Sequence, residues 1–330
     1  MSEGAGAVSE LAAAVARGDR RALGRAITLV ESERAEDALL AEELLTALLP
    51  RTGNSLRVGV TGPPGAGKST LIDALGRQLI LQGERVAVLA IDPSSPVGGG
   101  SILGDKTRMG RLAAEPASFI RPSPSRGEQG GVGRHTADAV LLCEAAGYSV
   151  VLIETLGTGQ GEHAVAGLVD CLILVLIPGA GDELQGMKRG AIELSDVVVV
   201  NKADGERRAA AELLALELTG ALGLFSRATG SSAPKVASVS ASEERGLGEL
   251  WGAVAASVAS ARASGAFEKR RAAGTRRVLL EQLEQAFRAE LQAPTLGAER
   301  SRLETEVLAG RLTTREAARR LAALARKPTG

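Results

Sequence analysis

The sequence predicts an α/β fold with a mostly parallel sheet, extended by helical segments at both ends of the chain. Three observations lead to this prediction. Short, β-branched apolar runs alternate with helix-length segments through the middle of the chain, as they do in parallel sheets covered on both faces. A glycine-rich loop joins the first of these runs to a helical pattern. Both terminal regions instead carry apolar residues at helical spacing.

The first unit that we expect is a helical extension over residues 1–53. Leu23, Ile27 and Val30 recur at helical spacing, and leucines recur in the same way between residues 39 and 48. The turn-forming sequence Pro50–Asn54 then breaks the pattern. It is interpreted as a short linker to the next domain.

The second unit is the α/β domain over residues 54–262. Its expected strands are the apolar runs Val58–Val60, Val86–Ile91, Val150–Ile153, Cys171–Ile177, Val197–Val200 and Val236–Val239. Ligands of such open parallel sheets bind at the carboxyl ends of the strands. Each chemical motif described below follows one of these runs, which is consistent with a single ligand site.

The third unit is helical and covers residues 263–330. Leu279, Leu283 and Phe287 mark one apolar face, and Thr313 and Glu316 have the spacing of a capping box. Two arrangements are open at this point. The helices either pack on the main sheet or form an arm that pairs with a second copy of the chain.

Composition limits the functional class. Lys and Arg together number 39, as do Asp and Glu, so the formal net charge is zero, which argues against a nucleic-acid-binding protein. Charges and glycines interrupt every apolar stretch, so no membrane span is expected. Cys143 and Cys171 lie in apolar segments and are interpreted as buried thiols of a cytoplasmic protein.

The segment after the first apolar run fits the pattern G-x-x-x-x-G-K-[ST], the phosphate-binding loop of P-loop NTPases. Backbone N–H groups in such a loop point at phosphate oxygens, and the following helix adds the positive end of its dipole. Lys68 is expected to reach the β- and γ-phosphates, and the Ser69 hydroxyl to bind Mg²⁺. The nucleotide-binding set is Gly62, Pro63, Pro64, Gly65, Ala66, Gly67, Lys68, Ser69 and Thr70.

Asn201-Lys202-Ala203-Asp204 follows the Val197–Val200 run and fits the N-K-x-D pattern of guanine-binding proteins. The Asp204 carboxylate can accept hydrogen bonds from N1–H and the 2-amino group of guanine, and adenine has no such pair of donors. Asn201 can support the loop, and the stem of Lys202 can cover the ring. Ser240-Ala241, after the last run, has the position of a further base-recognition segment. We therefore expect GTP and GDP as ligands.

Three acidic residues are candidates for Mg²⁺ binding beside Ser69. Glu154 ends the Val150–Ile153 run and is followed by Gly157, whose backbone N–H is expected at the γ-phosphate. Asp92 ends the Val86–Ile91 run and could also orient the attacking water. Asp105 lies in the glycine-rich segment that follows. The candidate catalytic residues are Lys68, Asp92, Glu154 and Gly157.

The water-positioning Gln of small GTPases is absent at its usual place, because Thr158 follows Gly157. The sequence therefore predicts slow intrinsic turnover that a partner accelerates. Supplying a missing transition-state group can raise a GTPase rate by ~10³–10⁵-fold.

Taken together, the central segments resemble MeaB/ArgK-type G proteins, the GTPase chaperones of adenosylcobalamin-dependent methylmalonyl-CoA mutase. The matching segments, in chain order, are Gly62–Ser69, Asp92–Pro96, Gly99–Met109, Ile120–Gly127, Glu154–Glu162, Gly181–Lys188 and Asn201–Gly205. The resemblance implies a G domain of the SIMIBI class of P-loop NTPases, with an N-terminal helical extension and a C-terminal dimerisation arm.

The resemblance also implies a function. The protein would be a homodimeric GTPase whose nucleotide state gates adenosylcobalamin loading and protects or reactivates a B12-dependent acyl-CoA mutase. Asp92–Met109 and Glu154–Glu162 would be the first two switches, and Gln185 and Lys188 in a third would couple nucleotide state to the mutase. The alternatives are a kinase of a basic-amino-acid transport system and a metal-insertion GTPase.

Overall fold

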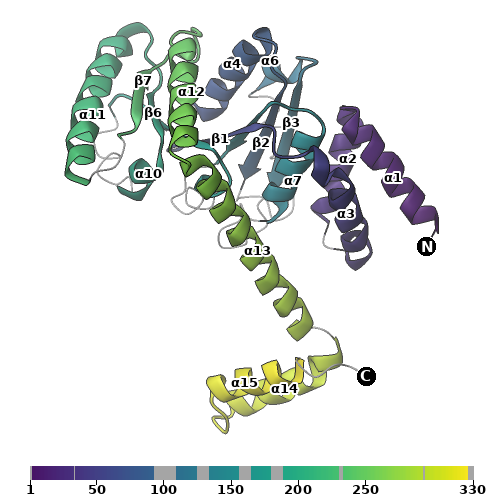
Figure 1. Ribbon diagram of the computed structural model, residues 1–330. Coiled ribbons are helices and arrows are strands. Elements are labelled where there is room, and N and C mark those ends of the chain that lie inside the picture. The colour runs from purple at the N-terminus through teal and green to yellow at the C-terminus, as the bar shows by residue number, and fades with distance from the viewer. Residues whose placement is uncertain are drawn as a thin grey trace. The chain divides into compact units, whose positions relative to one another are not determined.

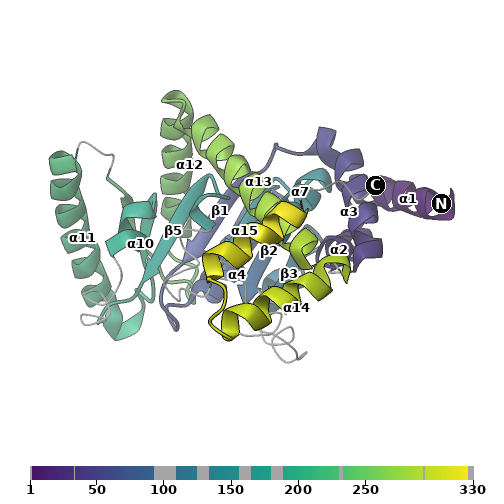
Figure 2. The ribbon, with the colours of Figure 1, turned by 90° about the horizontal axis from the view of Figure 1, so that it is seen from below.

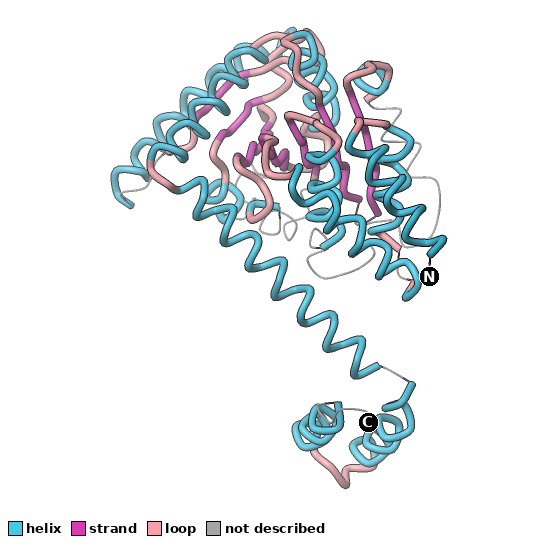
Figure 3. Tube along the Cα trace, turned by 45° about the vertical axis from the view of Figure 1, so that its right-hand side comes forward, coloured by secondary structure: helices cyan, strands magenta, loops and turns pink. Residues whose placement is uncertain are grey.

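The computed structural model describes residues 2–32, 34–92, 109–124, 134–155, 165–179, 189–229, 233–292 and 294–325. A seven-stranded sheet with the order β3-β2-β4-β1-β5-β6-β7 lies at its centre, and every neighbouring pair of strands is parallel. Helices flank both faces of this sheet (Figure 1 and Figure 3). The predicted α/β fold class, with helical extensions at both ends, is confirmed.

The strands are β1 Leu56–Thr61, β2 Val86–Asp92, β3 Ser118–Pro124, β4 Val150–Glu154, β5 Cys171–Leu176, β6 Val197–Val200 and β7 Lys235–Ser238. The helices are α1 Ser2–Ala16, α2 Arg20–Val30, α3 Ala35–Leu48, α4 Lys68–Leu81, α6 Gly110–Ala113, α7 Arg134–Ala145, α10 Arg189–Leu194, α11 Arg208–Thr229, α12 Leu247–Ala263, α13 Ala266–Gln292, α14 Pro294–Leu308 and α15 Thr314–Ala325. Two 3₁₀ turns are η1 Leu49–Arg51 and η2 Gly205–Arg207.

All six apolar runs of the sequence form strands, and β3 is the strand that hydrophobic patterning did not predict. Its sequence contains one apolar pair, Phe119-Ile120, and two prolines. Proline cannot donate a hydrogen bond, so it is tolerated in a strand at the edge of a sheet. β3 lies at that edge and pairs with β2 alone.

The two faces of the sheet are covered by different helices, as the alternation of side chains along a strand requires. Val58, Val60 and Ile173 face a large apolar cluster to which α4 and α12 contribute. Leu174 and Val198 face the opposite side, where residues of α10 and α11 complete a smaller cluster. Few aromatic rings are available, so aliphatic side chains fill both layers.

Cys143 and Cys171 are both fully buried. Burial raises the pKa of each thiol far above its usual range, because the thiolate would lose its hydration. The interpretation of these residues as buried apolar groups is confirmed.

The N-terminal helices pack on one another and on α7. Asp19 caps α2 by accepting hydrogen bonds from the backbone N–H groups of Arg21 and Ala22, at 2.8 and 2.9 Å. Leu23, Ile27 and Val30 are buried along the inner face of α2, at the predicted helical spacing.

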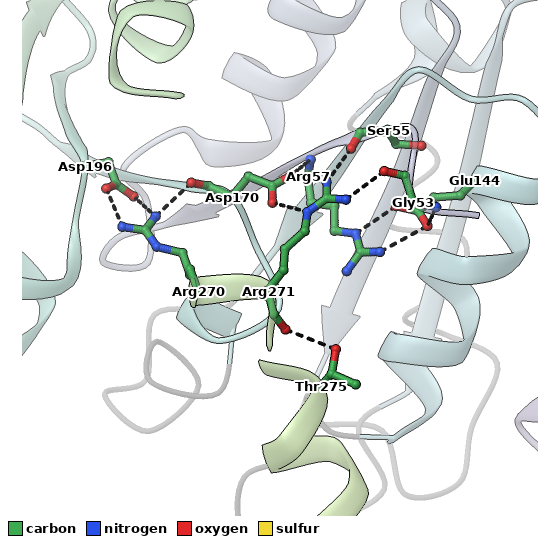
Figure 4. Close-up of polar contacts among 9 residues, drawn as sticks. All are labelled: Gly53, Ser55, Arg57, Glu144, Asp170, Asp196, Arg270, Arg271 and Thr275. Carbon is green, nitrogen blue, oxygen red and sulfur yellow. Dashed lines mark hydrogen bonds and ion pairs between the residues drawn. The ribbon is translucent and has the colours of Figure 1, made fainter. Parts of the chain in front are cut away.

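A cluster of charged residues fixes the start of α13 to the amino-terminal edge of the sheet (Figure 4). The Arg271 guanidinium binds the Asp170 carboxylate through two hydrogen bonds of 2.7 Å, and the Asp170 side chain is 1 % exposed. Arg270 binds Asp196 in the same way, at 2.7 and 2.9 Å. Paired hydrogen bonds of this kind are strong and directional. We call these four residues the α13 clamp.

The polypeptide backbones are also very close at the α13 clamp. A Cβ atom on Gly274 would lie 1.9 Å from the carbonyl oxygen of Gly167, so only glycine fits at this position. Arg271 further donates to the carbonyl oxygens of Gly53 and Ser55, each at 2.7 Å. The clamp therefore joins segments that are more than 200 residues apart in the sequence.

The chain divides into two compact units, residues 1–275 and 276–330. In the second unit α14 and α15 lie side by side (Figure 1 and Figure 2). The backbone N–H of Glu316 donates to the Thr313 hydroxyl at 3.2 Å, which is one of the two bonds of the predicted capping box. On α13, Leu279, Leu283 and Phe287 are largely exposed within the single chain.

Within the described residues, none of the helices combines the length and the apolar character that crossing a bilayer requires.

Candidate functional site

Four of the predicted motifs meet at the carboxyl-terminal edge of the sheet. The glycine-rich loop follows β1, Glu154 ends β4, Asn201 follows β6, and Ser240-Ala241 follows β7 after one intervening residue. Parallel strands place their carboxyl ends on one edge, and contacts between the motifs, described next, show that they form one site. The α13 clamp lies at the opposite edge.

The glycine-rich loop wraps tightly between β1 and α4. Gly62 has a φ of +146°, and a Cβ atom there would lie 2.3 Å from the carbonyl oxygen of Val175. Gly67 is the left-handed N-cap of α4, which begins at Lys68. The unpaired N–H groups of the first helical turn therefore face the loop. Such a loop can enclose an anionic group such as a phosphate.

Lys68 is the cation of this loop. Its ammonium group donates to the carbonyl oxygens of Gly62 at 2.8 Å and Pro63 at 3.1 Å, and the residue is only 6 % exposed. A buried ammonium is unfavourable unless polar groups compensate it. These two carbonyl groups compensate the charge and hold the ammonium group at the loop.

Ser69 and Glu154 bring two oxygen-bearing side chains together. The Ser69 hydroxyl donates to the Glu154 carboxylate at 2.7 Å, and Glu154 is buried. Oxygen ligands of this kind suit Mg²⁺, which binds few protein groups and keeps several waters. The donor set present in the described residues therefore fits this cation.

A buried hydroxyl pair that the sequence did not indicate lies beneath Glu154. Thr155 donates to the hydroxyl of Thr61 at 2.9 Å, and both residues are buried. This bond ties the carboxyl ends of β4 and β1 together where the glycine-rich loop begins. Threonine is common in strands, so no local pattern distinguishes this pair.

Asn201 connects the loop to the region after β7. Its amide nitrogen donates to the carbonyl oxygen of Ala66 at 2.9 Å, and its amide oxygen accepts from the backbone N–H of Ala241 at 3.3 Å. Asn201 is 2 % exposed. Its role is to position two segments, and Lys202 next to it adopts a left-handed backbone with a φ of +60°.

Two serine hydroxyls orient the Asp204 carboxylate. Ser240 and Ser242 donate to its Oδ2 atom at 2.8 and 2.6 Å. These hydrogen bonds hold the pKa of the Asp204 carboxyl below its usual range, and the bond from Ser242 has the larger effect. The group is therefore an anionic hydrogen-bond acceptor at neutral pH. Ser242 was not among the predicted residues, although the Ser240-Ala241-Ser242 sequence is a possible signal.

Several predicted residues lie outside the described residues, namely Asp105, Gly157, Gln185 and Lys188. Asp92 ends β2 as expected, but its side chain is also outside the described part. Among the side chains that are described, no group of three or more His, Cys, Asp or Glu residues could hold a metal ion. The predicted ligand set of Ser69, Asp92, Asp105 and Glu154 therefore stays a prediction.

Comparison with known families gives a match over most of the chain. Residues 23–295 match the family described as methylmalonyl Co-A mutase-associated GTPase MeaB. A probable GTPase of Mycobacterium tuberculosis is 50% identical over 319 residues, which cover 96% of this chain and 95% of that protein. GTPase ArgK of Escherichia coli is 50% identical over 238 residues, 72% of each chain.

Two further relatives extend the comparison. The mitochondrial methylmalonic aciduria type A homolog of Mus musculus is 47% identical over 254 residues, covering 74% of this chain and 61% of that protein. The crystal structure of an LAO/AO transport system kinase superposes with a TM-score of 0.72 at 35% identity, covering 96% of this chain and 97% of that chain.

Proposed function

Since this chain belongs to the MeaB family of methylmalonyl-CoA mutase-associated GTPases, we propose that it gates adenosylcobalamin loading of a B12-dependent acyl-CoA mutase of the methylmalonyl-CoA mutase type. The protein is a GTPase that binds guanine nucleotide, because its family is a GTPase family and its relatives are described as GTPases. The association with a mutase rests on the family description and on the name of the mouse relative. GTP hydrolysis would protect or reactivate the mutase.

The contact network around Asn201 supports the proposed binding mode best. Asn201 ties the loop at Ala66 to the segment that holds Asp204, so the phosphate and base sites have a fixed separation. In the proposed complex the backbone of residues 62–70 surrounds the phosphates, and Lys68 reaches the β- and γ-phosphates. Asp204 accepts hydrogen bonds from the guanine base.

The proposed hydrolytic machinery combines described and undescribed residues. Ser69 and Glu154, with Asp92 and Asp105, would hold Mg²⁺, which supplies positive charge to the phosphate oxygens when bound. Lys68 stabilises negative charge on the transferred group, and Asp92 orients the attacking water. The backbone N–H of Gly157 contacts the γ-phosphate.

Replacing Asp204 with asparagine should weaken GTP binding selectively. The variant loses the anionic acceptor for two guanine donors, and a hydrogen bond to a charged group contributes ~1.5–3 kcal/mol. We expect a loss of about 2 kcal/mol, which corresponds to roughly 30-fold in Kd. Calorimetric titration with GTP and GDP measures this change. ATP affinity should not fall, because adenine lacks the two donors that bind the Asp204 carboxylate.

Glu206→Gln is a matched control, because Glu206 is an exposed carboxylate two residues beyond Asp204. It removes the same charge without touching the proposed base contact, and its GTP affinity should stay close to that of the wild type. If Asp204→Asn bound GTP as tightly as this control, base recognition by Asp204 would be wrong.

The proposal extends to the assembly of the protein. Residues 263–330 would form an arm that pairs with a second copy, and the exposed apolar side chains of Leu279, Leu283 and Phe287 on α13 are suited to such a contact. Gln185 and Lys188 would couple nucleotide state to the mutase. The site of action would be the cytoplasm.

A binding and turnover experiment tests the proposed function. An adenosylcobalamin-dependent methylmalonyl-CoA mutase is mixed with the protein loaded with GDP or with a non-hydrolysable GTP analogue, and complex formation is measured. Hydrolysis of GTP is then followed with and without the mutase. We expect affinity to depend on the nucleotide and the rate to rise. If the mutase neither binds nor changes the rate, the proposal fails.

The same assay addresses the kinase alternative, which gains some support from the solved relative described as a transport system kinase. Transfer of labelled γ-phosphate to a protein acceptor, in place of release as free phosphate, would favour it.

A further inference from the structure

A basic groove lies between α2 and the edge strand β3, away from the nucleotide motifs. Its volume is about 1180 Å³, and both elements line it. α2 and β3 are neighbours at this end of the sheet in two perpendicular views (Figure 1 and Figure 2). The β3 side includes Arg121 and Pro122, part of the Ile120–Gly127 segment that has no role in the proposed nucleotide site.

The charge of the groove is unbalanced, although the chain as a whole is neutral. Five arginines line it, against two carboxylates: Arg20, Arg21, Arg25, Arg34, Arg121, Glu31 and Asp37. Both carboxylates already have partners, because Glu31 pairs with Arg121 and Asp37 accepts a hydrogen bond from Ser32 at 2.6 Å. Asp37 keeps its negative charge, because the Ser32 hydroxyl is neutral, so five arginines against two carboxylates leave three excess positive charges in the groove.

Arg21 and Arg25 are two of the exposed arginines of this groove. They lie four residues apart on α2, and both are exposed, so their side chains project from the same helical face. Among the described residues, neither makes an ion pair with a carboxylate. The Asp19 carboxylate at the start of α2 is bound to backbone N–H groups instead.

The exposure and composition of the residues that line the groove indicate which class of ligand it can bind. A small-molecule site usually encloses its ligand and fixes it with a few placed polar groups, whereas Arg21 and Arg25 are exposed and unconstrained by contacts. Non-specific single-strand binding uses exposed aromatic rings, and the aromatic ring in this groove, Phe119, is 7 % exposed. An extended peptide cannot pair along the whole β3 edge, because Pro122 and Pro124 have no N–H group.

We propose that this groove docks an acidic surface segment of the partner mutase through its arginine side chains. This inference rests on the proposed function and adds a contact surface to it. Opposite potentials on two protein surfaces mainly accelerate association and orient the partners. The nucleotide-dependent contacts would then form on a complex that is already oriented.

Charge reversal of the two exposed arginines tests the proposal. Arg21→Glu/Arg25→Glu is compared with the wild type for binding to the same methylmalonyl-CoA mutase, with stopped-flow association rates and equilibrium Kd values. At about 50 mM salt we expect roughly tenfold weaker binding, mostly through slower association. At about 0.5 M salt the difference should fall below about threefold, because salt screens exposed charges.

Lys235→Glu/Lys269→Glu is the matched control. Both lysines are exposed in the same compact unit and lie outside the groove, and this variant has the same net charge as the first. We expect its mutase affinity to stay within about twofold of the wild type, since exposed charges act over roughly a Debye length. Intrinsic GTP hydrolysis and the thermal midpoint should be unchanged in both variants. If charge reversal lowers the thermal midpoint, the milder variant Arg21→Gln/Arg25→Gln replaces it in the binding measurements.

Each outcome separates this proposal from the proposed function. If the wild type and the groove variants bind the mutase equally well, the groove is not a docking site for the mutase, and the proposed chaperone function still stands. If the lysine control loses as much mutase affinity as the groove variant, the docking proposal also fails, because net charge alone would explain the loss. Absence of mutase binding by the wild type in every nucleotide state refutes both. Tighter binding of a single-stranded DNA oligonucleotide than of the mutase, lost in the groove variants, would reassign the groove to nucleic acid.

Discussion

Lys68→Ala is expected to lower kcat for GTP hydrolysis by about 10²–10³-fold, the range found when one preorganised charge-stabilising group is removed from an active site. Lys68 is held by the carbonyl oxygens of Gly62 and Pro63 within a loop of fixed shape. We therefore expect its charge to lie close to the bound phosphates and to need little reorganisation during the reaction. Single-turnover phosphate release measures the change without interference from product dissociation.

Lys235→Ala is a suitable control for this prediction, because Lys235 is an exposed lysine at the start of β7, at the other edge of the sheet. It should hydrolyse GTP at the wild-type rate. The fold of Lys68→Ala should survive, since the lost hydrogen bonds are confined to the loop, and circular dichroism checks this point. A folded Lys68→Ala protein with more than about a tenth of wild-type kcat would contradict a charge-stabilising role of this size.

Arg271→Ala is expected to destabilise the protein by about 3–5 kcal/mol, the usual effect of removing one partner of a buried ion pair. The Asp170 carboxylate, 1 % exposed, would lose both guanidinium hydrogen bonds. The carbonyl groups of Gly53 and Ser55 would lose a donor as well. A fall in the melting temperature of about 10 °C corresponds to this loss for a domain of this size.

Two companion variants define the cause of that effect. Arg208→Ala removes an exposed arginine that pairs with Glu212 on the same helix, and exposed pairs of this type contribute little to stability because water screens both charges. Arg271→Lys keeps the charge and loses the paired geometry, so its stability should be intermediate. A loss in Arg271→Ala no larger than that in Arg208→Ala would show that the α13 clamp does not stabilise the fold.

The parts of the fold that the sequence predicted depend on local patterns. The Val197–Val200 run and the helical spacing of Leu23, Ile27 and Val30 are visible within a few residues, and both were predicted correctly. The meeting of the loop, Glu154 and Asn201 at one edge also followed, because strand ends in a parallel sheet converge. β3 was missed, because its prolines conceal an edge strand.

The contacts that were not predicted connect distant parts of the chain. Arg271 lies 101 residues from Asp170, and Arg270 lies 74 residues from Asp196. Periodicity carries no information about such pairs, and arginine on a helix is normally solvated. The Thr61–Thr155 bond was missed for the same reason, since it depends on which strand ends become neighbours in space. Ser242 was missed although its place in the Ser240-Ala241-Ser242 sequence is a possible local signal.

The α13 clamp also determines where the polypeptide can be shortened. A fragment ending at residue 262 would contain every described nucleotide motif, yet it would leave Asp170 and Asp196 without the guanidinium groups that neutralise them. Extending the fragment through Thr275 would retain both arginines and the close backbone contact between Gly274 and Gly167. We therefore expect the smallest stable fragment that contains the nucleotide motifs to include the first ten residues of α13, Ala266 to Thr275.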